Sequence, residues 1–109
     1  MPTSDIIKFK TGSGSGRADM VCPRCGNDYL HHQSVTSFDR IEDSPVVLET
    51  TVSRGEAKMK MADSSTSRNP SSRRDGLEIV FMCEACEEGR TLSLFISQHK
   101  GQTEMFWEY

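Results

Sequence analysis

The sequence lacks any long apolar run, and this absence limits what the protein can be. Hydrophobic residues make up 35% of the 109 residues, and no stretch of them approaches the roughly 20 residues that a membrane-spanning helix needs. The segment from Met1 to Lys10 also lacks the apolar region of a secretory signal. We therefore expect no membrane association and a reducing, intracellular location, either cytoplasmic or, in a eukaryote, nuclear.

Large apolar side chains are scarce as well. The chain has five phenylalanines, two tyrosines and one tryptophan. A chain of this length forms one domain at most, and burial of so small a core leaves it marginally stable. A bound metal compensates for this in many small domains, and structural zinc contributes an apparent ~10–16 kcal/mol in finger peptides. We expect folding and metal loading to be one event.

The sequence also lacks the metal-site patterns of known enzyme classes. Neither His-Glu-x-x-His nor His-x-Glu with a following Pro-Cys-x-x-Cys occurs. A catalytic zinc ion keeps one coordination position open, which a set of four cysteines does not leave. We therefore expect no enzymatic activity, no catalytic residues and no small-molecule substrate.

The chain does contain four cysteines, arranged as two Cys-x-x-Cys pairs: Cys22 with Cys25, and Cys83 with Cys86. Two intervening residues let the backbone turn so that both sulfurs of a pair reach one metal ion at about 2.3 Å. Pro23 presets the turn of the first pair, and Gly26 after it can adopt a positive φ. Four thiolates suit one tetrahedral, structural Zn²⁺ ion, so these four cysteines are the predicted metal ligands.

Other uses of the cysteines stay open at this point. Two disulfides need an oxidising compartment, and a thioredoxin-type pair needs a βαβ context that the sequence does not show. Iron can use the same four thiolates, because ligand type alone does not separate it from zinc. A thiol redox switch is a further alternative. His31, His32 and His99 are candidates for additional ligands, but four thiolates already close a tetrahedral site.

The residues of the two turns resemble the zinc ribbon family. Cys22-Pro-Arg-Cys25-Gly26 precedes a predicted strand, and Phe81-Met-Cys83-Glu-Ala-Cys86 follows one. The resemblance implies rubredoxin-like knuckles, three antiparallel strands and one structural zinc ion held by the four cysteines. Members of that family occur in transcription elongation factors, RNA polymerase subunits, ribosomal proteins and replication proteins. The resemblance therefore implies an interaction module of transcription or another information-processing assembly.

The chain departs from the family pattern in three places. Between Cys25 and Cys83 lie 57 residues, where compact sites have about 15–20. The second knuckle has Glu87 at the position of Gly26 in the first. Elongation-factor ribbons carry an Asp-Glu pair at a hairpin tip, and the nearest counterpart here, Glu42-Asp43, has the reverse order and is typical of a solvated turn.

Alternation of apolar and polar residues predicts a sheet. Val46 to Val52 alternates in this way, and Tyr29 to Phe38 is rich in aromatic and β-branched residues without helical periodicity, so the two form a predicted hairpin. Three further strands are predicted where apolar residues recur at every second position: Leu77, Ile79 and Phe81; Leu92, Leu94 and Ile96; and Met105, Trp107 and Tyr109. The predicted fold class is mostly β: a small antiparallel sheet of three to five strands, zinc-ribbon-like, with a flexible N-terminus and a long disordered loop.

Segments with little to bury set the predicted domain limits. Residues 1–18 are expected to be a flexible N-terminal segment that ends in a Gly/Ser linker at 11–16, with an accessory strand or docking segment around Ile6, Ile7 and Phe9. Residues 19–109 are the expected zinc-ribbon domain. Within it, residues 53–76 are expected to form a mobile insertion, because most of them offer no apolar face. A short helix over Glu56 to Met61 is an alternative for its start.

The uneven charge bears on the partner. Residues 54–75 contain six basic and three acidic residues, so the rest of a chain with net charge −3 carries −6. This basic loop, together with an exposed aromatic face of Phe95 and Phe106, can form a nucleic-acid surface, whereas Trp107 is expected in the core. Acidic residues near the aromatic strands repel phosphates. A protein partner is therefore the main expectation, and nucleic acid is the alternative.

Overall fold

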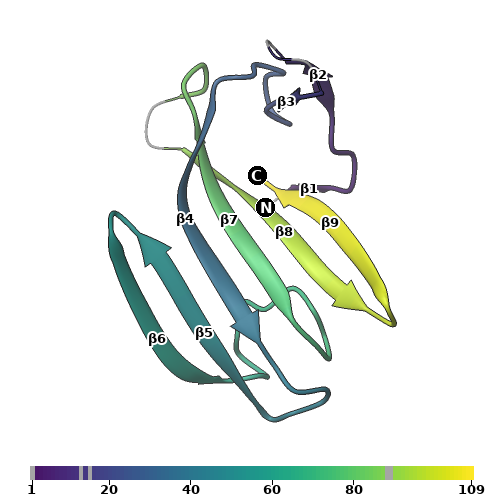
Figure 1. Cartoon of the computed structure of the whole chain (residues 1–109), viewed down its shortest axis with the longest axis vertical. Helices are drawn as coiled ribbons and strands as arrows, with labels where there is room; N and C mark the ends of the chain where they lie inside the picture. The colour runs from purple at the N-terminus through teal and green to yellow at the C-terminus, as the bar shows by residue number, and fades with distance from the viewer. Residues whose placement is uncertain (1, 13, 15, 88–89) are drawn as a thin grey trace.

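Nine strands and no helix make up the part of the chain described by the computed structural model, residues 2–12, 14, 16–87 and 90–109 (Figure 1). Ser13 and Ser15 of the predicted linker lie outside these residues. The described part contains no helix long and apolar enough to cross a membrane. The strands are β1 (Thr3–Ser4), β2 (Phe9–Thr11), β3 (Ala18–Met20), β4 (Leu30–Asp39), β5 (Val46–Ser53), β6 (Glu56–Asp63), β7 (Gly76–Cys83), β8 (Thr91–His99) and β9 (Gln102–Glu108).

Seven of the strands form one antiparallel sheet in the order β1-β9-β8-β7-β4-β5-β6. β2 and β3 form a separate two-stranded sheet. The prediction of a mostly β protein is confirmed, and the strands predicted at β4, β5, β7, β8 and β9 are present. The predicted limit of three to five strands is wrong. β2 begins at Phe9, within the accessory strand that was one alternative for the N-terminal segment. β1, β3 and the insertion strand β6 were not predicted.

The largest correction concerns β6, which lies inside the stretch predicted to be mobile. A two-residue turn at Arg54-Gly55 joins it to β5, with φ of 52° and 77°. Positive φ at both turn residues gives the twist that a tight hairpin needs, and glycine adopts it without a steric penalty. All eight residues of β6 pair with β5. The helix alternative over Glu56 to Met61 is therefore also wrong, because strand pairing overrides the local helix propensity.

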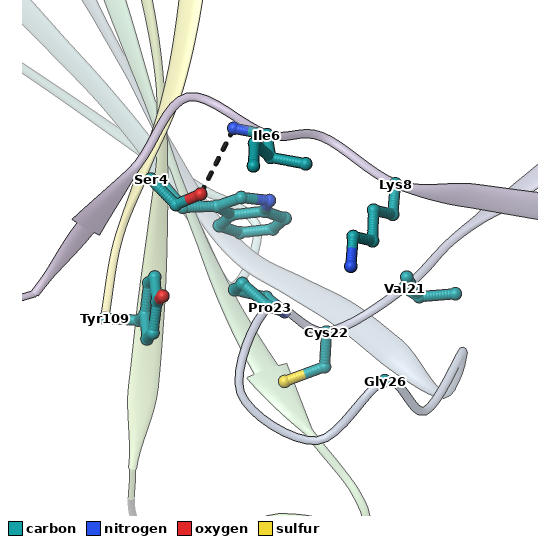
Figure 2. A pocket seen from close by; sticks show the side chains of 9 residues that line it. Ser4, Ile6, Lys8, Val21, Cys22, Pro23, Gly26 and Tyr109 are labelled. Atoms are coloured by element: carbon teal, nitrogen blue, oxygen red, sulfur yellow. Dashed lines mark hydrogen bonds between the residues drawn. The ribbon is translucent and has the colours of Figure 1, made fainter.

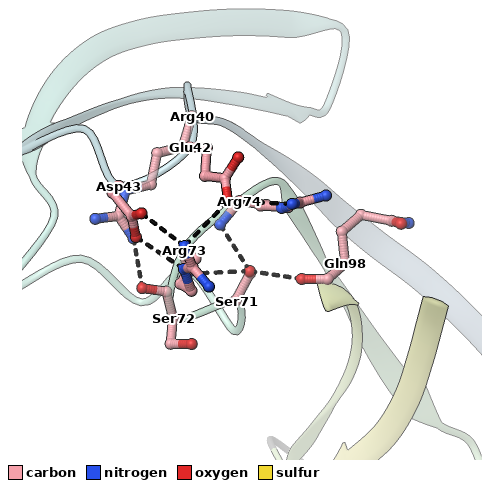
Figure 3. Close-up of polar contacts among 8 residues, drawn as sticks. All are labelled: Arg40, Glu42, Asp43, Ser71, Ser72, Arg73, Arg74 and Gln98. Atoms are coloured by element: carbon pink, nitrogen blue, oxygen red, sulfur yellow. Dashed lines mark hydrogen bonds and ion pairs between the residues drawn. The ribbon is translucent and has the colours of Figure 1, made fainter. Parts of the chain in front are cut away.

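The rest of the predicted insertion, residues 64–75, is an ordered loop in this structure. Ser71 Oγ donates to the carbonyl of Gln98 at 2.7 Å, and Arg40 donates to the carbonyl of Ser72 at 2.8 Å (Figure 3). Arg73 forms a two-bond ion pair with Asp43 at 2.9 and 2.8 Å. These contacts replace the apolar face that the loop sequence lacks.

The two faces of the large sheet are covered at opposite ends. The metal face carries the core cluster of Cys22, Cys83, Leu92, Leu94 and Trp107, against which Ile7 of the N-terminal segment and Met20 of β3 pack. The opposite face, the loop face, carries the buried side chains Phe38, Val47 and Phe95, of which Phe38 and Phe95 lie beside residues of the 64–75 loop. Phe95 stacks on Phe106 with ring centroids 5.1 Å apart.

The N-terminal segment is tied to the sheet at two points. β1 pairs with β9, and the backbone N–H of Tyr109 donates to the carbonyl of Pro2 at 2.9 Å. Lys10 and Asp28 form an ion pair at 2.7 Å between the β2–β3 sheet and the first Cys-x-x-Cys loop. The first part of the chain therefore lies against the end of the sheet that carries the cysteines. The domain boundary between residues 18 and 19 stays a prediction.

Candidate metal centre

The first knuckle is the loop that connects β3 to β4. The N–H of Gly26 donates to the carbonyl of Cys22 at 2.9 Å, and the N–H of Cys22 donates to the carbonyl of Asn27 at 2.8 Å. Gly26 has a φ of 78°, which residues with a Cβ rarely adopt. The N–H of Arg24 points at the Cys22 sulfur, 3.4 Å away. This tight turn brings both sulfurs of the pair to one side.

The second knuckle begins at the last residue of β7. Cys83 pairs with Leu30, the first residue of β4, and the N–H of Glu84 donates to the carbonyl of Tyr29 at 3.1 Å. The N–H of Cys86 donates to the carbonyl of Cys83 at 3.3 Å. Pairing of β4 with β7 thus carries the second knuckle to the first, although 57 residues separate them in the sequence.

The four sulfurs form one cluster. Cys22 Sγ lies 3.6 Å from Cys86 Sγ, Cys25 Sγ lies 3.6 Å from Cys83 Sγ, and Cys86 Sγ lies 3.7 Å from Cys25 Sγ. Four ligands about 2.3 Å from a common metal ion lie about 3.8 Å from one another in a regular tetrahedron. A disulfide needs a sulfur separation of about 2.05 Å. The spacing therefore fits a shared metal ion and not a disulfide.

Electrostatics around the cluster favour a bound cation. Burial raises the pKa of Cys86 to about 12, and the adjacent thiols of Cys83 and Cys22 add to this rise. Burial also raises the pKa of Cys83, whereas a backbone hydrogen bond at Asn27 lowers the pKa of Cys25. Four thiolates this close repel one another, and a cation among them removes that repulsion. The donor set and its spacing both fit a divalent metal ion.

The cluster is part of the hydrophobic core. Cys22 and Cys83 are 2% and 3% exposed, and Trp107 of the same cluster is fully buried. Figure 2 shows the N-terminal chain from Ser4 to Lys8 crossing beside the first knuckle. Residues of both segments line a pocket of about 260 Å³. Loss of the cysteine geometry therefore disturbs the packing of the N-terminal segment and of β8 and β9.

The other predicted site residues lie outside this cluster. His31 Nε2 contacts the Glu84 carboxylate at 3.0 Å, and both side chains are half exposed. Among the described residues, none of the three histidines joins the cluster of four cysteines that could hold a metal ion. The prediction that Trp107 is a core residue is confirmed. The prediction of an exposed aromatic face is wrong for Phe95, which is 4% exposed.

Sequence reasoning missed the backbone donors of the knuckles and the role of the N-terminal segment. Arg24 and Asn27 act on the thiols through main-chain N–H groups, which leave no signature in side-chain identity. Ile7 and Met20 pack against the cysteine cluster. The apolar residues near the N-terminus are the one signal that pointed to this packing.

No protein-family model, curated protein or solved structure matches this chain. The resemblance to zinc ribbons therefore rests on the two Cys-x-x-Cys turns and their surroundings.

Proposed function

We propose that this chain is a non-catalytic protein-interaction module whose fold is stabilised by one structural Zn²⁺ ion bound to Cys22, Cys25, Cys83 and Cys86. The observation that carries the proposal is the set of sulfur separations of 3.6, 3.6 and 3.7 Å across the two pairs. Zinc is proposed over iron because a closed set of four cysteines with Cys-x-x-Cys spacing is typical of structural zinc.

The local arrangement supports a zinc-ribbon-like role for the metal. β4, β7 and β8, the strands next to the knuckles, are antiparallel neighbours in the sheet. A bound ion would join the loop before β4 to the connection between β7 and β8. Because four protein ligands complete a tetrahedral shell, no coordination position is left for a substrate. The metal then acts on stability, and the sheet surface carries the function.

A protein partner is proposed in preference to nucleic acid. Three of the four arginines of the basic loop are engaged with acids: Arg68 contacts Glu78 and Glu108, Arg73 contacts Glu42 and Asp43, and Arg74 contacts Glu42. The buried Phe95 does not offer a stacking surface. Placement of the module in a transcription assembly belongs to the same proposal and follows the zinc-ribbon resemblance. The reducing intracellular compartment expected from the sequence belongs to the proposal as well.

Replacement of single cysteines tests the proposal. Cys83→Ser should bind no stoichiometric zinc and should lose its cooperative thermal transition, because structural zinc supplies an apparent ~10–16 kcal/mol in small domains. His31→Gln is the matched control, since it alters a polar side chain beside the second knuckle and leaves all four thiols in place. It should retain one zinc ion per chain and the melting curve of the unaltered protein. A Cys83→Ser variant that folds as well as His31→Gln would refute a structural metal.

A further inference from the structure

β6 is an edge strand with an open side (Figure 1). Seven of its eight residues are exposed, and within the described part of the chain it pairs with β5 alone. In an antiparallel pair, every second residue directs its N–H and C=O away from the partner strand. Ser53 and Glu56 flank the two-residue turn and form a hydrogen-bonded pair, so Glu56 directs its N–H and C=O toward β5. The backbone groups that point away from β5 therefore belong to Ala57, Met59, Met61 and Asp63.

The two faces of this edge differ in chemistry. On the loop face, Lys58 and Lys60 line a groove of about 430 Å³ together with Glu49 and Thr51. Lys60 is 74% exposed on its side chain and stands 3.7 Å from Glu49, whereas Lys58 has no ion pair within the described residues. The edge therefore presents two exposed cations, two residues apart, of which Lys58 has no acidic partner among the described residues.

The metal face of the same edge is apolar and uncovered. Met59 and Met61 are 68% and 61% exposed, and the neighbouring β5 adds Val46 and Val52 at 45% and 52%. These side chains lie on the face whose other end is covered by the N-terminal segment, away from the cysteine cluster. An exposed apolar patch on an open strand edge marks an interaction site.

A second copy of the same edge is a poor occupant. Two sheets join correctly only when residues of matching faces stand opposite each other. The two antiparallel registers that pair most of the strand place Lys58 opposite the second copy's Lys60, or Lys60 opposite the second copy's Lys60. Like charges directly opposite destabilise a strand pair, and lysines on an edge are a known protection against self-association.

We propose that the open edge of β6 binds an extended segment of another protein as an eighth strand, and that this segment alternates acidic with apolar residues. Its backbone pairs with the outward groups of Met59 and Met61. Its acidic side chains lie beside Lys58 and Lys60, and its apolar side chains cover the methionines. This is strand addition, in which main-chain hydrogen bonds provide affinity and alternate side chains provide specificity. The inference rests on the proposed function, because it names the surface and partner chemistry of the module.

The probe for the test is a fluorescein-labelled ten-residue peptide of alternating glutamate and valine. A peptide of the same composition with its glutamates and valines in two blocks, and an alternating lysine–valine peptide, serve as controls. Fluorescence anisotropy with zinc-loaded protein should show saturable binding of the alternating acidic peptide alone. Binding should weaken by about ten-fold between low and high salt, since ion pairs at exposed sites are screened.

Protein variants then separate backbone pairing from charge. Met59→Pro removes one outward N–H without touching the pairing with β5, so binding should weaken by about ten-fold or more while the melting curve persists. Met59→Thr keeps the N–H and is its control. Lys58→Glu combined with Lys60→Glu should reverse the preference toward the lysine–valine peptide, which remains a valid readout if Met59→Pro does not fold.

Three results overturn strand addition: equal binding of the blocked peptide, no binding of the alternating peptide by folded protein, or a dimer in sedimentation that Met59→Pro dissolves. The last result assigns the edge to a second copy of the chain. Zinc content and melting curves of the same samples test the proposed function separately. Folded, zinc-loaded protein that ignores the peptide refutes strand addition alone, whereas metal-free folded protein refutes the zinc module.

Discussion

Replacement of Gly76 by alanine tests whether the loop of residues 64–75 is packed on the sheet. A Cβ at position 76 would lie 2.6 and 2.7 Å from two side-chain carbons of Pro70, and it would also clash with the side-chain oxygen of Asn69. These separations are shorter than van der Waals contact. Gly76 is the buried first residue of β7, where the backbone has little freedom to move. The loop must therefore shift away from the strand.

The magnitude follows from what the shift breaks. Asn69 holds the loop together by accepting from the N–H of Ser71 at 3.1 Å and donating to the carbonyl of Arg74 at 2.9 Å. Steric overpacking costs about 1–3 kcal/mol, and each hydrogen bond contributes about 1 kcal/mol. We expect Gly76→Ala to lower the free energy of unfolding by about 2–4 kcal/mol, which corresponds to a fall of roughly 10–20 °C in Tm for a domain of this size.

Urea unfolding of zinc-loaded protein, followed by tryptophan fluorescence, measures this loss. Ser72→Ala, in the same loop, is the control, because within the described part of the chain Ser72 forms a hydrogen bond through its backbone carbonyl, which accepts from Arg40, and none through its side chain. It should stay within about 0.5 kcal/mol of the unaltered protein. A Gly76→Ala variant as stable as Ser72→Ala would show that the loop is mobile in solution, and the ordered loop described above would be incorrect.

Three further predictions concern single side chains. Glu78 is 8% exposed and accepts hydrogen bonds from Arg68 and Ser93 at 2.8 Å each. Glu78→Gln should lower the free energy of unfolding in urea by about 1–2 kcal/mol, and an unchanged unfolding midpoint would contradict this. Trp107 is fully buried, and its indole N–H has no hydrogen-bond partner among the described residues. Trp107→Phe should therefore lower the free energy of unfolding by about 1 kcal/mol and Trp107→Ala by about 3–5 kcal/mol, and equal losses of Tm for the two variants would refute the packing argument. The Arg73 hydrogen bond lowers the pKa of Asp43. The ionised Asp43 carboxylate therefore stabilises the fold above about pH 4, and this stabilisation is lost as the pH falls. In urea unfolding, the free energy of unfolding of the unaltered protein should exceed that of Asp43→Asn by less in acid than at neutral pH. An excess that grows in acid would contradict the argument.

Four of the five predicted strands were predictable because apolar residues recur at every second position, so that each strand has a face to bury. The fifth, Tyr29 to Phe38, was predicted from its aromatic and β-branched residues. The sequence did not show that the metal face is exposed to solvent at β5 and β6, where the N-terminal segment does not cover it. Val46 and Val52 are exposed in β5, and the fully buried residue of that strand is Val47 on the other face. Alternation predicts which residues share a face of the sheet, but it does not predict which part of the chain packs on that face.

β6 and the loop were missed for a different reason. Ala57, Lys58 and Met59 favour helices in isolation, and their strand state depends on pairing with β5 and on the positive φ at Arg54 and Gly55. The loop is ordered by long-range contacts, such as the ion pair of Arg73 with Asp43, that no local pattern contains. The clustering of the four cysteine sulfurs was predictable from spacing alone, because each Cys-x-x-Cys turn directs its two sulfurs toward one point.

The central claim, that four sulfurs share one structural zinc ion, is tested most directly by X-ray absorption spectroscopy at the zinc edge on protein purified under reducing conditions, with metal content measured on the same sample. The expected result is one zinc ion per chain with four sulfur neighbours at about 2.3 Å. A shell that contains nitrogen or oxygen, or protein that folds without a stoichiometric metal, would contradict it.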